Sequence, residues 1–289
     1  MRSVLGEQFP ELDAHSARLV GEGFDNSVWL IDDEWAFRFP RRAIAVPLVA
    51  REVEVLTRVA PLVPVPVPAP SFVGSESELF PRPFFGHQLL RGSELADATF
   101  TDSDRARLGI EIGRFLRALH APATREIVDA DGALPRDPNR RADMPFRVTK
   151  TRERLDALTD LAPESRRAAA RILSDAEGLP PSAREVLVHG DLHVRHVLVE
   201  RGRLSGVIDW GDVCIGDPSI DLLFLWSVLP PDAREAFFEE YGHVDDATRL
   251  RARVLAIMLS VVLVLYARDQ RLPGLEREAL AGLERALVD

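Results

Sequence analysis

Cysteine is nearly absent from this chain of 289 residues, which carries only Cys214. One thiol cannot form an intrachain disulfide, so a disulfide-stabilised secreted scaffold is excluded and a reducing cytoplasm is favoured. Basic side chains are also in the minority, because 46 acidic residues against 36 basic ones leave a formal net charge of −10. This balance argues against nonspecific nucleic-acid binding, which depends on Lys and Arg neutralising phosphates.

Long apolar runs are missing as well. The most apolar stretch, Leu255–Ala267, is shorter than the roughly 20 residues that a membrane-spanning helix needs. The first residues, Met1–Gln8, have no apolar core of the kind found in signal peptides. We therefore expect a cytoplasmic protein without a membrane partner, in which Leu255–Ala267 is a buried helix. Cys214 is expected to be a small buried filler.

The segment with most chemistry is a predicted β-hairpin in the second half of the chain. Two apolar runs, 196–200 and 204–209, flank a turn centred on Gly202. Pairing about that turn brings Asp209 to the open end of the hairpin, where the loop that carries Asp191 enters. Transfer of a nucleotide's terminal phosphoryl group needs such an arrangement, with one carboxylate to orient the attacking hydroxyl and others to hold Mg²⁺.

The motifs of this region resemble a known signature. His189–His193, Ile208–Trp210 and Gly216–Pro218 occur in the order typical of the aminoglycoside phosphotransferase and choline kinase-like family of small-molecule kinases. The resemblance is dense in the back half of the chain and loose in the front half. It implies an α+β, bilobal protein-kinase-like fold, with a small antiparallel-sheet nucleotide-binding lobe at 1–90 and a mainly helical lobe at 91–289 that carries the catalytic loop and acceptor site.

The resemblance also implies roles and ligands. ATP or GTP would be the phosphoryl donor, Mg²⁺ the metal, and a small molecule with a hydroxyl group the acceptor, whereas monomer or dimer stays undecided. Asp191 would orient the acceptor hydroxyl, and Asp209 and His196 would hold the metal. Three supporting residues would brace the loop or add positive charge near the transferred group: His189, His193 and Arg195.

His196 departs from the common pattern. Most of the family has Asn at this position, and the macrolide phosphotransferases are similar to this chain in having His. Mg²⁺ prefers oxygen ligands, so His196 can also be a polar strand-start residue that never touches metal. As a metal ligand of ordinary pKa it predicts that turnover collapses below about pH 6.

The expected function is therefore a kinase of the macrolide 2'-phosphotransferase type. An aminoglycoside kinase, a metabolic alcohol kinase and a catalytically silent kinase-like binding module remain as alternatives. A metal-dependent hydrolase is disfavoured, because it gives no role to two predicted nucleotide-side residues, Arg38 and Glu52.

Two segments near the start of the chain, and a hinge further on, are expected to meet the nucleotide. The glycine-rich turn 21–26 between two strands can lay backbone N–H groups over phosphates, with Asn26 and Ser27 beside it, although an ordinary turn fits too. Arg38 is the only cation of the predicted strand 34–39, which in this family carries the phosphate-binding cation; the alternative is an edge-strand residue facing solvent.

The helix that follows supplies a partner for Arg38. Glu52 lies on the same side as the apolar stripe of this helix, whereas Glu54 is rotated about 200° away and faces water. A buried carboxylate needs an ion-pair partner, so Glu52 is expected to pair with Arg38. Pairing of Glu52 with a neighbouring arginine of its own helix is the alternative.

A hinge and a polar loop complete the expectations. Backbone groups near Gln88, Leu89 and Leu90 would meet the purine edge. The loop 129–145 borders the acceptor in related enzymes, and its acidic residues would attract an amine if its arginines did not offset them. We therefore interpret segment 129–145 as a solvated loop. Four residues are expected to be structural rather than catalytic or metal-binding: the cap Thr101, the helix-end His120, and Asp217 and Asp221.

Overall fold

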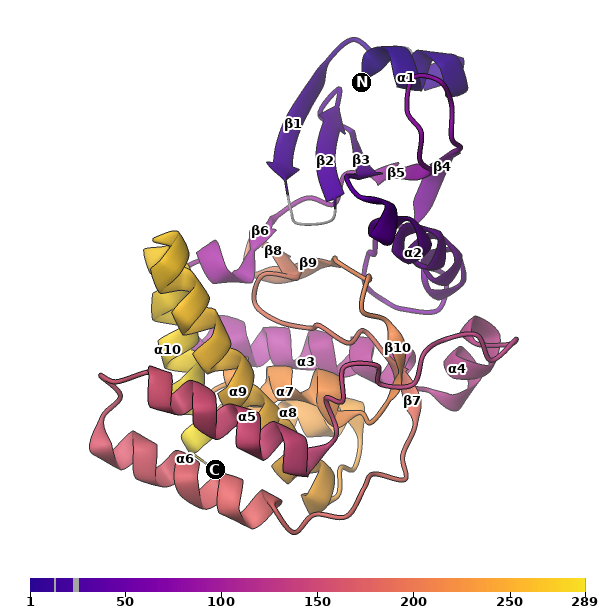
Figure 1. Cartoon of the computed structure of the whole chain (residues 1–289). Coiled ribbons are helices and arrows are strands. Elements are labelled where there is room, and N and C mark those ends of the chain that lie inside the picture. Colours follow the sequence, from indigo (N-terminus) through magenta and orange to yellow (C-terminus); the bar gives the residue numbers. More distant parts are fainter. Residues whose placement is uncertain (13, 23–25, 289) are drawn as a thin grey trace.

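The protein consists of a small strand-rich part and a larger helical part (Figure 1). The computed structural model describes residues 1–12, 14–22 and 26–288. Among these residues, the first part holds an antiparallel sheet with the strand order β1-β2-β3-β5-β4. Its elements are α1 (Arg2–Gln8), β1 (Ala17–Glu22), β2 (Asn26–Ile31), β3 (Trp35–Pro40), α2 (Val46–Val59), β4 (Pro70–Gly74) and β5 (Phe84–Gln88), with short 3-10 turns at Pro10–Leu12 and Ala43–Ala45.

Phenylalanines at alternate positions of β3 build the core of this sheet. Phe37 and Phe39 are buried, and the ring centroid of Phe39 lies 4.4 Å from that of Phe84 on β5. Because successive side chains of a strand point to opposite faces, Arg38 must leave on the other face. That face is covered by α2, which explains how a cation in an apolar strand reaches Glu52.

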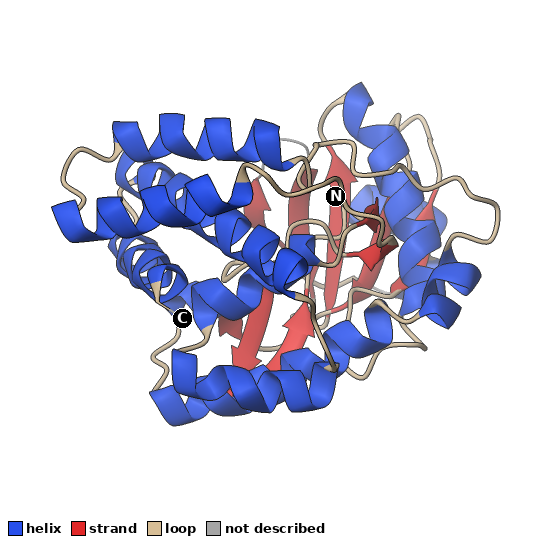
Figure 2. Ribbon diagram, turned by 90° about the horizontal axis from the view of Figure 1, so that it is seen from below, coloured by secondary structure: helices blue, strands red, loops and turns tan. Residues whose placement is uncertain are grey.

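The second part is a layer of helices. Seen from below, these helices lie in front of the strands, so the two parts form successive layers (Figure 2). The helix that begins after Thr101 has the predicted capping box, in which Thr101 and Asp104 satisfy each other's backbone N–H groups. The helices are α3 (Asp102–Leu119), α4 (Pro122–Val128), α5 (Met144–Ala157), α6 (Pro163–Ala176), α7 (Ser219–Val228), α8 (Pro231–Tyr241), α9 (Asp246–Gln270) and α10 (Pro273–Leu287), with a 3-10 turn at Leu95–Asp97.

The length of α9 corrects one expectation. The apolar stretch was expected to be too short for a membrane span, but the helix runs for 25 residues and is long and apolar enough by length and composition alone. In the fold, 61% of its most apolar window is buried, and it packs against α5, α6, α7 and α10. Its apolar side chains are therefore used in helix packing, as predicted for a core helix.

Short strands form the seam between the two parts. The antiparallel pair β8 and β9 is extended by β6, and β7 pairs with β10, where Cys214 is buried opposite Val188. The predicted α+β kinase-like arrangement is thus confirmed, whereas a lobe boundary at residue 90 stays a prediction. The bounds are β6 (Ser93–Glu94), β7 (Val186–Val188), β8 (Val197–Glu200), β9 (Arg203–Val207) and β10 (Cys214–Gly216).

Candidate active site

The hairpin of β8 and β9 brings the two predicted carboxylates together. Arg201 and Gly202 have φ angles of 51° and 74°, the left-handed pair that a tight two-residue turn requires. Asp209 follows β9 with a φ of 65°, a region that Asp tolerates better than most residues. This backbone turn directs Asp209 toward the loop of Asp191, so the predicted hairpin is confirmed.

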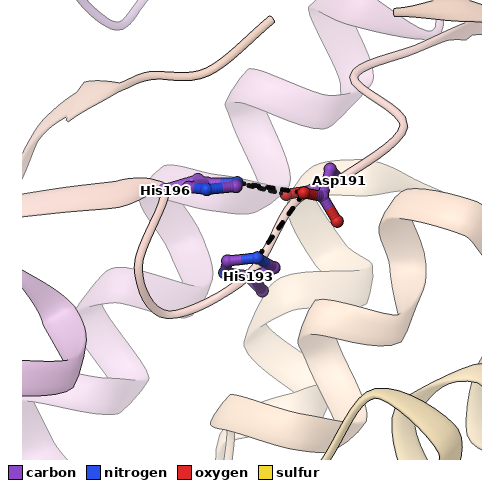
Figure 3. A group of neighbouring side chains, drawn as sticks. All are labelled: Asp191, His193 and His196. Carbon is purple, nitrogen blue, oxygen red and sulfur yellow. Dashed lines mark hydrogen bonds and ion pairs between the residues drawn. The ribbon is translucent and has the colours of Figure 1, made fainter. Parts of the chain in front are cut away.

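Asp191 lies among three histidines. Its Oδ2 is 3.6 Å from Nε2 of His193 and 3.5 Å from Nδ1 of His196 (Figure 3). Burial alone would raise the pKa of this carboxyl, but contacts with His193, His196 and His189 lower the pKa well below its usual range. Asp191 is therefore an ionised acceptor, which suits a group that orients a hydroxyl rather than one that must hold a proton.

The ring of His196 is fixed in one tautomer. Its Nδ1 lies 2.8 Å from the backbone carbonyl oxygen of Asp191, and a carbonyl only accepts, so Nδ1 carries the proton. The lone pair is then on Nε2, which faces Oδ2 of Asp209 at 3.4 Å. An imidazole nitrogen oriented by a second hydrogen bond and facing a carboxylate fits a divalent cation.

A second set of possible ligands overlaps with this pair. Asp191, His193 and His196 each bring one ligand atom within 4.8 Å of the others. The two imidazole rings stack with a centroid distance of 3.9 Å. His196 belongs to both arrangements.

The pKa of His196 differs from that of an ordinary histidine. Burial, followed by the neighbouring charge of His193, lowers the pKa of His196 to about 4. An imidazole in this position stays neutral at pH 6. The premise of an ordinary histidine pKa is therefore wrong, and a loss of turnover below about pH 6 no longer follows from His196.

Arg38 connects the sheet to the catalytic hairpin. Its NH1 lies 2.6 Å from Oε1 of Glu52, which is 2% exposed, and its NH2 lies 3.6 Å from Oδ1 of Asp209. Burial would lower the pKa of Arg38, but the two carboxylates more than offset this and the pKa is raised. The predicted ion pair is thus present, and the alternative partners of Glu52 are not used.

Two buried polar atoms in this area lack a protein partner within the part of the chain that the structure describes. They are Nε of Arg38, a donor, and Oδ1 of Asn26, an acceptor. Buried polar groups are normally hydrogen-bonded, so unpaired ones beside a cleft point to a ligand. A nucleotide phosphate supplies acceptors for the first, and the metal or ribose hydroxyls can satisfy the second.

A cleft of about 550 Å³ runs between the two parts of the protein. The predicted residues Asn26, Arg38, Glu52, Leu90, Asp191 and Asp209 all line it. Ser27 does not line the cleft, because side chains alternate along a strand and its side chain leaves on the other face of β2. The side chain of Gln88 is exposed, and a role of its backbone groups stays a prediction. Leu89, predicted with the hinge, lines the cleft as well. The rest of the lining was not anticipated, and consists of Val28, Ala36, Leu48, Pro68, His87, Leu198, Ile208, Gly211 and Asp212.

The apolar members of that lining suit the faces of a purine. Val28 and Ala36 come from the sheet, whereas Leu198 and Ile208 come from the catalytic hairpin. Strand alternation could have identified Val28 and Ala36 as lining residues, since it places them on the same face as Asn26 and Arg38. The sequence does not identify Leu198 and Ile208 as lining residues, because only the fold brings the hairpin under the sheet.

The hinge offers fewer free backbone groups than expected. Burial lowers the pKa of His87 to about 4, so its neutral ring donates from Nδ1 to the Gln88 carbonyl oxygen at 2.9 Å. The Leu89 N–H donates to the Glu34 carbonyl oxygen at 2.7 Å. The Leu90 N–H has no protein acceptor among the described residues, and is the hinge donor that remains for a purine.

His189 braces the catalytic loop, as predicted. Its Nε2 lies 3.0 Å from the Ile208 carbonyl oxygen, and its Nδ1 accepts from the Asp191 N–H at 3.2 Å. Gly190 has a φ of 89°, and a Cβ there would stand 2.2 Å from the Asp212 carbonyl oxygen. The loop is thus held by contacts that leave no room for a side chain before Asp191.

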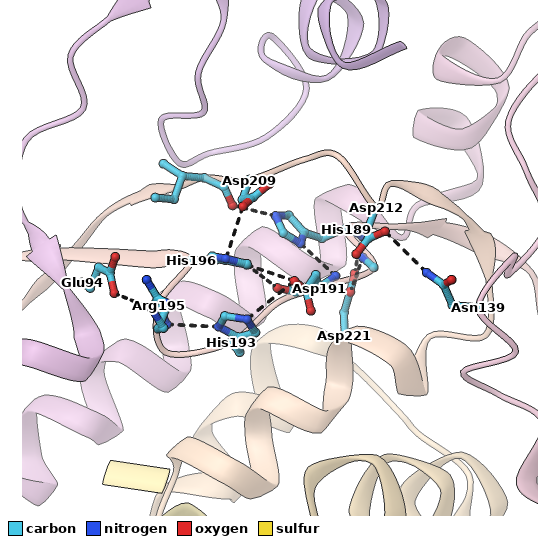
Figure 4. A network of polar contacts seen from close by, with 12 residues as sticks. Glu94, Asn139, His189, Asp191, His193, Arg195, His196, Asp209, Asp212 and Asp221 are labelled. Carbon is cyan, nitrogen blue, oxygen red and sulfur yellow. Dashed lines mark hydrogen bonds and ion pairs between the residues drawn. The ribbon is translucent and has the colours of Figure 1, made fainter. Parts of the chain in front are cut away.

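Asp221 supports the same loop from below (Figure 4). It is fully buried and accepts from the backbone N–H groups of His189 at 2.7 Å and Gly190 at 3.0 Å. His120 lies 3.1 Å from Asp221 through Nε2, and its Nδ1 is 2.8 Å from the hydroxyl of Tyr241. His120 ends its helix as predicted, but its link to the catalytic loop was not visible in the sequence.

Arg195 lies away from the reaction centre. Its Nε is 3.1 Å from Oε2 of Glu94, and its guanidinium lies 5.6 Å from the ring centroid of Tyr266. The expected positive charge near the transferred group is therefore not supplied by Arg195. His193, in contrast, touches Asp191.

The remainder of the predicted glycine-rich turn, residues 23–25, lies outside the described residues.

Comparisons with known proteins agree with this geometry. The profile of the phosphotransferase enzyme family matches residues 16–255. Viomycin phosphotransferase from Streptomyces vinaceus is 28% identical over 206 residues, which cover 70% of this chain and 68% of that enzyme. An aminoglycoside 3'-phosphotransferase from Escherichia coli is 37% identical over 67 residues, so the matched segment is 22% of this chain and spans a quarter (25%) of that enzyme's length.

Solved structures cover nearly the whole chain. The GDP complex of aminoglycoside 2'-phosphotransferase-IIIa superimposes with a TM-score of 0.71 at 24% identity, covering 99% of this chain and 97% of that one. The macrolide 2'-phosphotransferase apoenzyme from Brachybacterium faecium gives a TM-score of 0.64 at 26% identity, with 98% of each chain covered. The first likeness concerns the fold alone.

Proposed function

This chain belongs to the phosphotransferase enzyme family, and from that premise we propose that it transfers the terminal phosphoryl group of ATP or GTP to a hydroxyl group of a small molecule. One observation carries the proposal. Arg38, held by Glu52 of the sheet part, lies 3.6 Å from Asp209 of the catalytic hairpin. The cation and the carboxylate that the reaction needs thus share one cleft with Asp191.

The residues divide the work by position. Asp191, kept ionised by its histidine neighbours, accepts a hydrogen bond from the acceptor hydroxyl and directs it at the terminal phosphorus. Arg38 donates to the phosphates and withdraws charge from them. Asp209 and the Nε2 of His196 are the groups that would hold Mg²⁺, which neutralises phosphate charge when bound. Leu90 offers its N–H to the purine.

A macrolide-type antibiotic is one candidate acceptor. The imidazole at position 196 and the likeness to a macrolide 2'-phosphotransferase over 98% of the chain support this candidate. A metabolic alcohol with a negative charge is the second candidate, supported by the basic groove described below. Because nucleotide donors are abundant in the cytoplasm and the chain has a single thiol, we place the reaction there.

A nucleotide-consumption assay tests the proposal. ATP and GTP would each be combined with Mg²⁺ and a panel of macrolides, aminoglycosides and small metabolic alcohols, and diphosphate release would be followed. Acceptor-dependent release is expected from the wild type and from Arg152→Gln, a control on the outer side of α5. A lack of stimulation by every acceptor would favour a silent binding module, and stimulation by a metabolic alcohol alone would exclude the antibiotic candidates.

A further inference from the structure

We propose that the groove between α5 and α9 binds a phosphate or carboxylate group of the acceptor, so that the preferred acceptor is an anionic alcohol. This inference rests on the proposed function, since it takes the ligand of the groove to be the molecule that is phosphorylated. The groove has a volume of about 420 Å³. Its lining contains cations but no carboxylate, and consists of Asn139, Arg141, Phe146, Arg147, Lys150, Arg154 and Met258.

The helical repeat of α5 produces this basic lining. Arg147, Lys150 and Arg154 are three and four residues apart, which places them on one face of the helix. Arg152, on the same helix, is turned away and pairs with Glu177. In a chain with a net charge of −10, a groove lined by cations on one helix face differs from the average surface and attracts anions locally.

Arg147 is a half-buried cation without a carboxylate partner among the described residues. Its Nε donates to the Arg140 carbonyl oxygen at 2.9 Å, its NH2 donates to the Asn139 carbonyl oxygen, and its NH1 lies 3.5 Å from Sδ of Met258. Burial and the charges of Arg141 and Arg140 lower its pKa, and the charges of Asp137 and Asp143 offset this only in part. An anion in the groove would supply the missing counter-charge.

The other two cations of the helix face are weakly neutralised. Lys150 contacts Glu153 at 2.8 Å, but both side chains are about half exposed, and exposed pairs of this kind contribute little. Arg154 is exposed, and within the described residues no carboxylate lies within ion-pair distance of it. Both therefore keep most of their charge available to a ligand.

Acidic residues of the neighbouring loop are already used by the backbone. Asp137 accepts from the N–H groups of Arg141 and Ala142 at 2.8 Å each. Asp143 caps α5 by accepting from the Phe146 N–H and also pairs with Arg140. The loop that was expected to be neutral overall is thus basic on the side that faces the groove, which disfavours an amine-bearing acceptor.

The groove is connected to the reaction centre by one ion pair. Arg141 lies 2.8 Å from Oδ2 of Asp212, whose side chain lines the nucleotide cleft together with Asp191. Asn139, on the other side of the groove, lies 3.5 Å from Oδ1 of the same carboxylate (Figure 4). The groove and the cleft that contains Asp191 are therefore neighbours, joined through the pair of Arg141 and Asp212.

The chain offers a direct probe of this groove, because Lys150 is its only lysine. An amine-acylating reagent therefore marks Lys150 and the terminal amine alone, and peptide mass spectrometry gives the rate at Lys150. The protein would carry ADP and Mg²⁺, and four sugars would be compared at equal ionic strength: glucose 6-phosphate, glucuronate, glucose and N,N-dimethylglucosamine, whose tertiary amine does not consume the reagent. The two anions should slow acylation by at least about threefold, and their ratio tells phosphate from carboxylate preference.

Matched variants test the same groove without the label. Calorimetric binding of glucose 6-phosphate should weaken by about tenfold or more in Arg147→Gln and in Arg154→Gln, and stay unchanged in Arg152→Gln. Arg154→Gln alters an exposed side chain, so it keeps the test valid if Arg147→Gln disturbs the loop. Equal weakening in Arg152→Gln, or protection of Lys150 by N,N-dimethylglucosamine as strong as by the anions, would overturn the inference.

Failure of the groove and failure of the enzyme give different results. If the anionic sugars bind but no acceptor of any charge consumes nucleotide, the proposed function is wrong and the anion site remains. If nucleotide is consumed and the amine-bearing sugar is the better acceptor, the proposed function remains and the anionic-acceptor inference is wrong.

Discussion

Two arginines in different cavities, Arg38 and Arg147, show how the same side chain can have different roles. Arg38 is 13% exposed and lies between two carboxylates, those of Glu52 and Asp209. Arg147 makes its contacts to carbonyl oxygens and a sulfur, with no carboxylate partner in the described part of the chain. A cation that is paired with carboxylates of the protein is already positioned, whereas a cation without a carboxylate partner can bind an anionic ligand.

The difference follows from when each charge must be present. The donor side has to hold phosphates and metal in one geometry, so its ion pair is buried and fixed. The acceptor side has to discriminate among molecules, so its charge is left for the ligand to satisfy. Asp191 shares the nucleotide cleft with Arg38, and mutations at this centre and in each arginine region separate their contributions.

The largest effect is expected at the centre that both regions serve. Asp191→Asn and Asp209→Asn should each lower turnover by about 10²–10⁴-fold or more, because one removes the group that orients the hydroxyl and the other a metal ligand. Turnover would be measured with saturating nucleotide and the best acceptor found, and thermal unfolding would be followed in parallel. A near-active variant with an unchanged melting temperature would contradict the assignment.

The next largest effect separates the two arginine environments. Glu52→Ala should destabilise the fold by about 3–5 kcal/mol, because it leaves the buried charge of Arg38 without its closest partner. Arg154→Gln, on the open side, should change stability by no more than about 0.5 kcal/mol. Urea unfolding of both variants measures the two changes in stability. Changes of similar size would contradict the difference between the two arginine environments.

The smallest effect concerns acid and the buried support of the loop. Burial would raise the pKa of Asp221, but the hydrogen bond to His120, the charges of His120 and His189 and the Gly190 N–H lower it overall from its ordinary value of 3.8. A group whose folded pKa is depressed contributes stability that is present above its unfolded value and is lost as pH falls through the folded one. The stability advantage of wild type over Asp221→Asn should therefore shrink on acidification below 3.8.

Unfolding free energies at a series of pH values between about 3 and 7 check this point. Arg152→Gln serves as the control, because its curve should stay parallel to that of the wild type across the range. A difference between wild type and Asp221→Asn that does not change with pH would show that the carboxylate acts through its shape and hydrogen-bonding capacity rather than through its charge.

The sequence was sufficient for the parts of the site that are close together in the chain. The hairpin pairing, the position of Asp209 beside Asp191, and the orientation of Glu52 all follow from strand and helix periodicity. The pair of Arg38 and Glu52 also follows, because adjacent elements of the chain usually pack together. Ser27 was misplaced because the family position was used there instead of strand alternation.

The parts that were missed depend on contacts between distant segments. The link from Tyr241 through His120 to Asp221 joins three helices, and no periodicity encodes that meeting. The basic groove was missed for a related reason: the charges of loop 129–145 balance in the sequence, and only the structure shows that Asp137 and Asp143 are used to cap backbone N–H groups. The altered acidity of His196 likewise comes from burial that the sequence does not display.

The central claim is that this cleft moves a phosphoryl group from nucleotide to acceptor, and product analysis tests it most directly. With ATP, Mg²⁺ and an acceptor that stimulates turnover, mass spectrometry should find one phosphorylated acceptor for each nucleoside diphosphate released by the wild type, and none with Asp191→Asn. Release of diphosphate and free phosphate without any phosphorylated acceptor would contradict the account, because the protein would then be a nucleotide hydrolase.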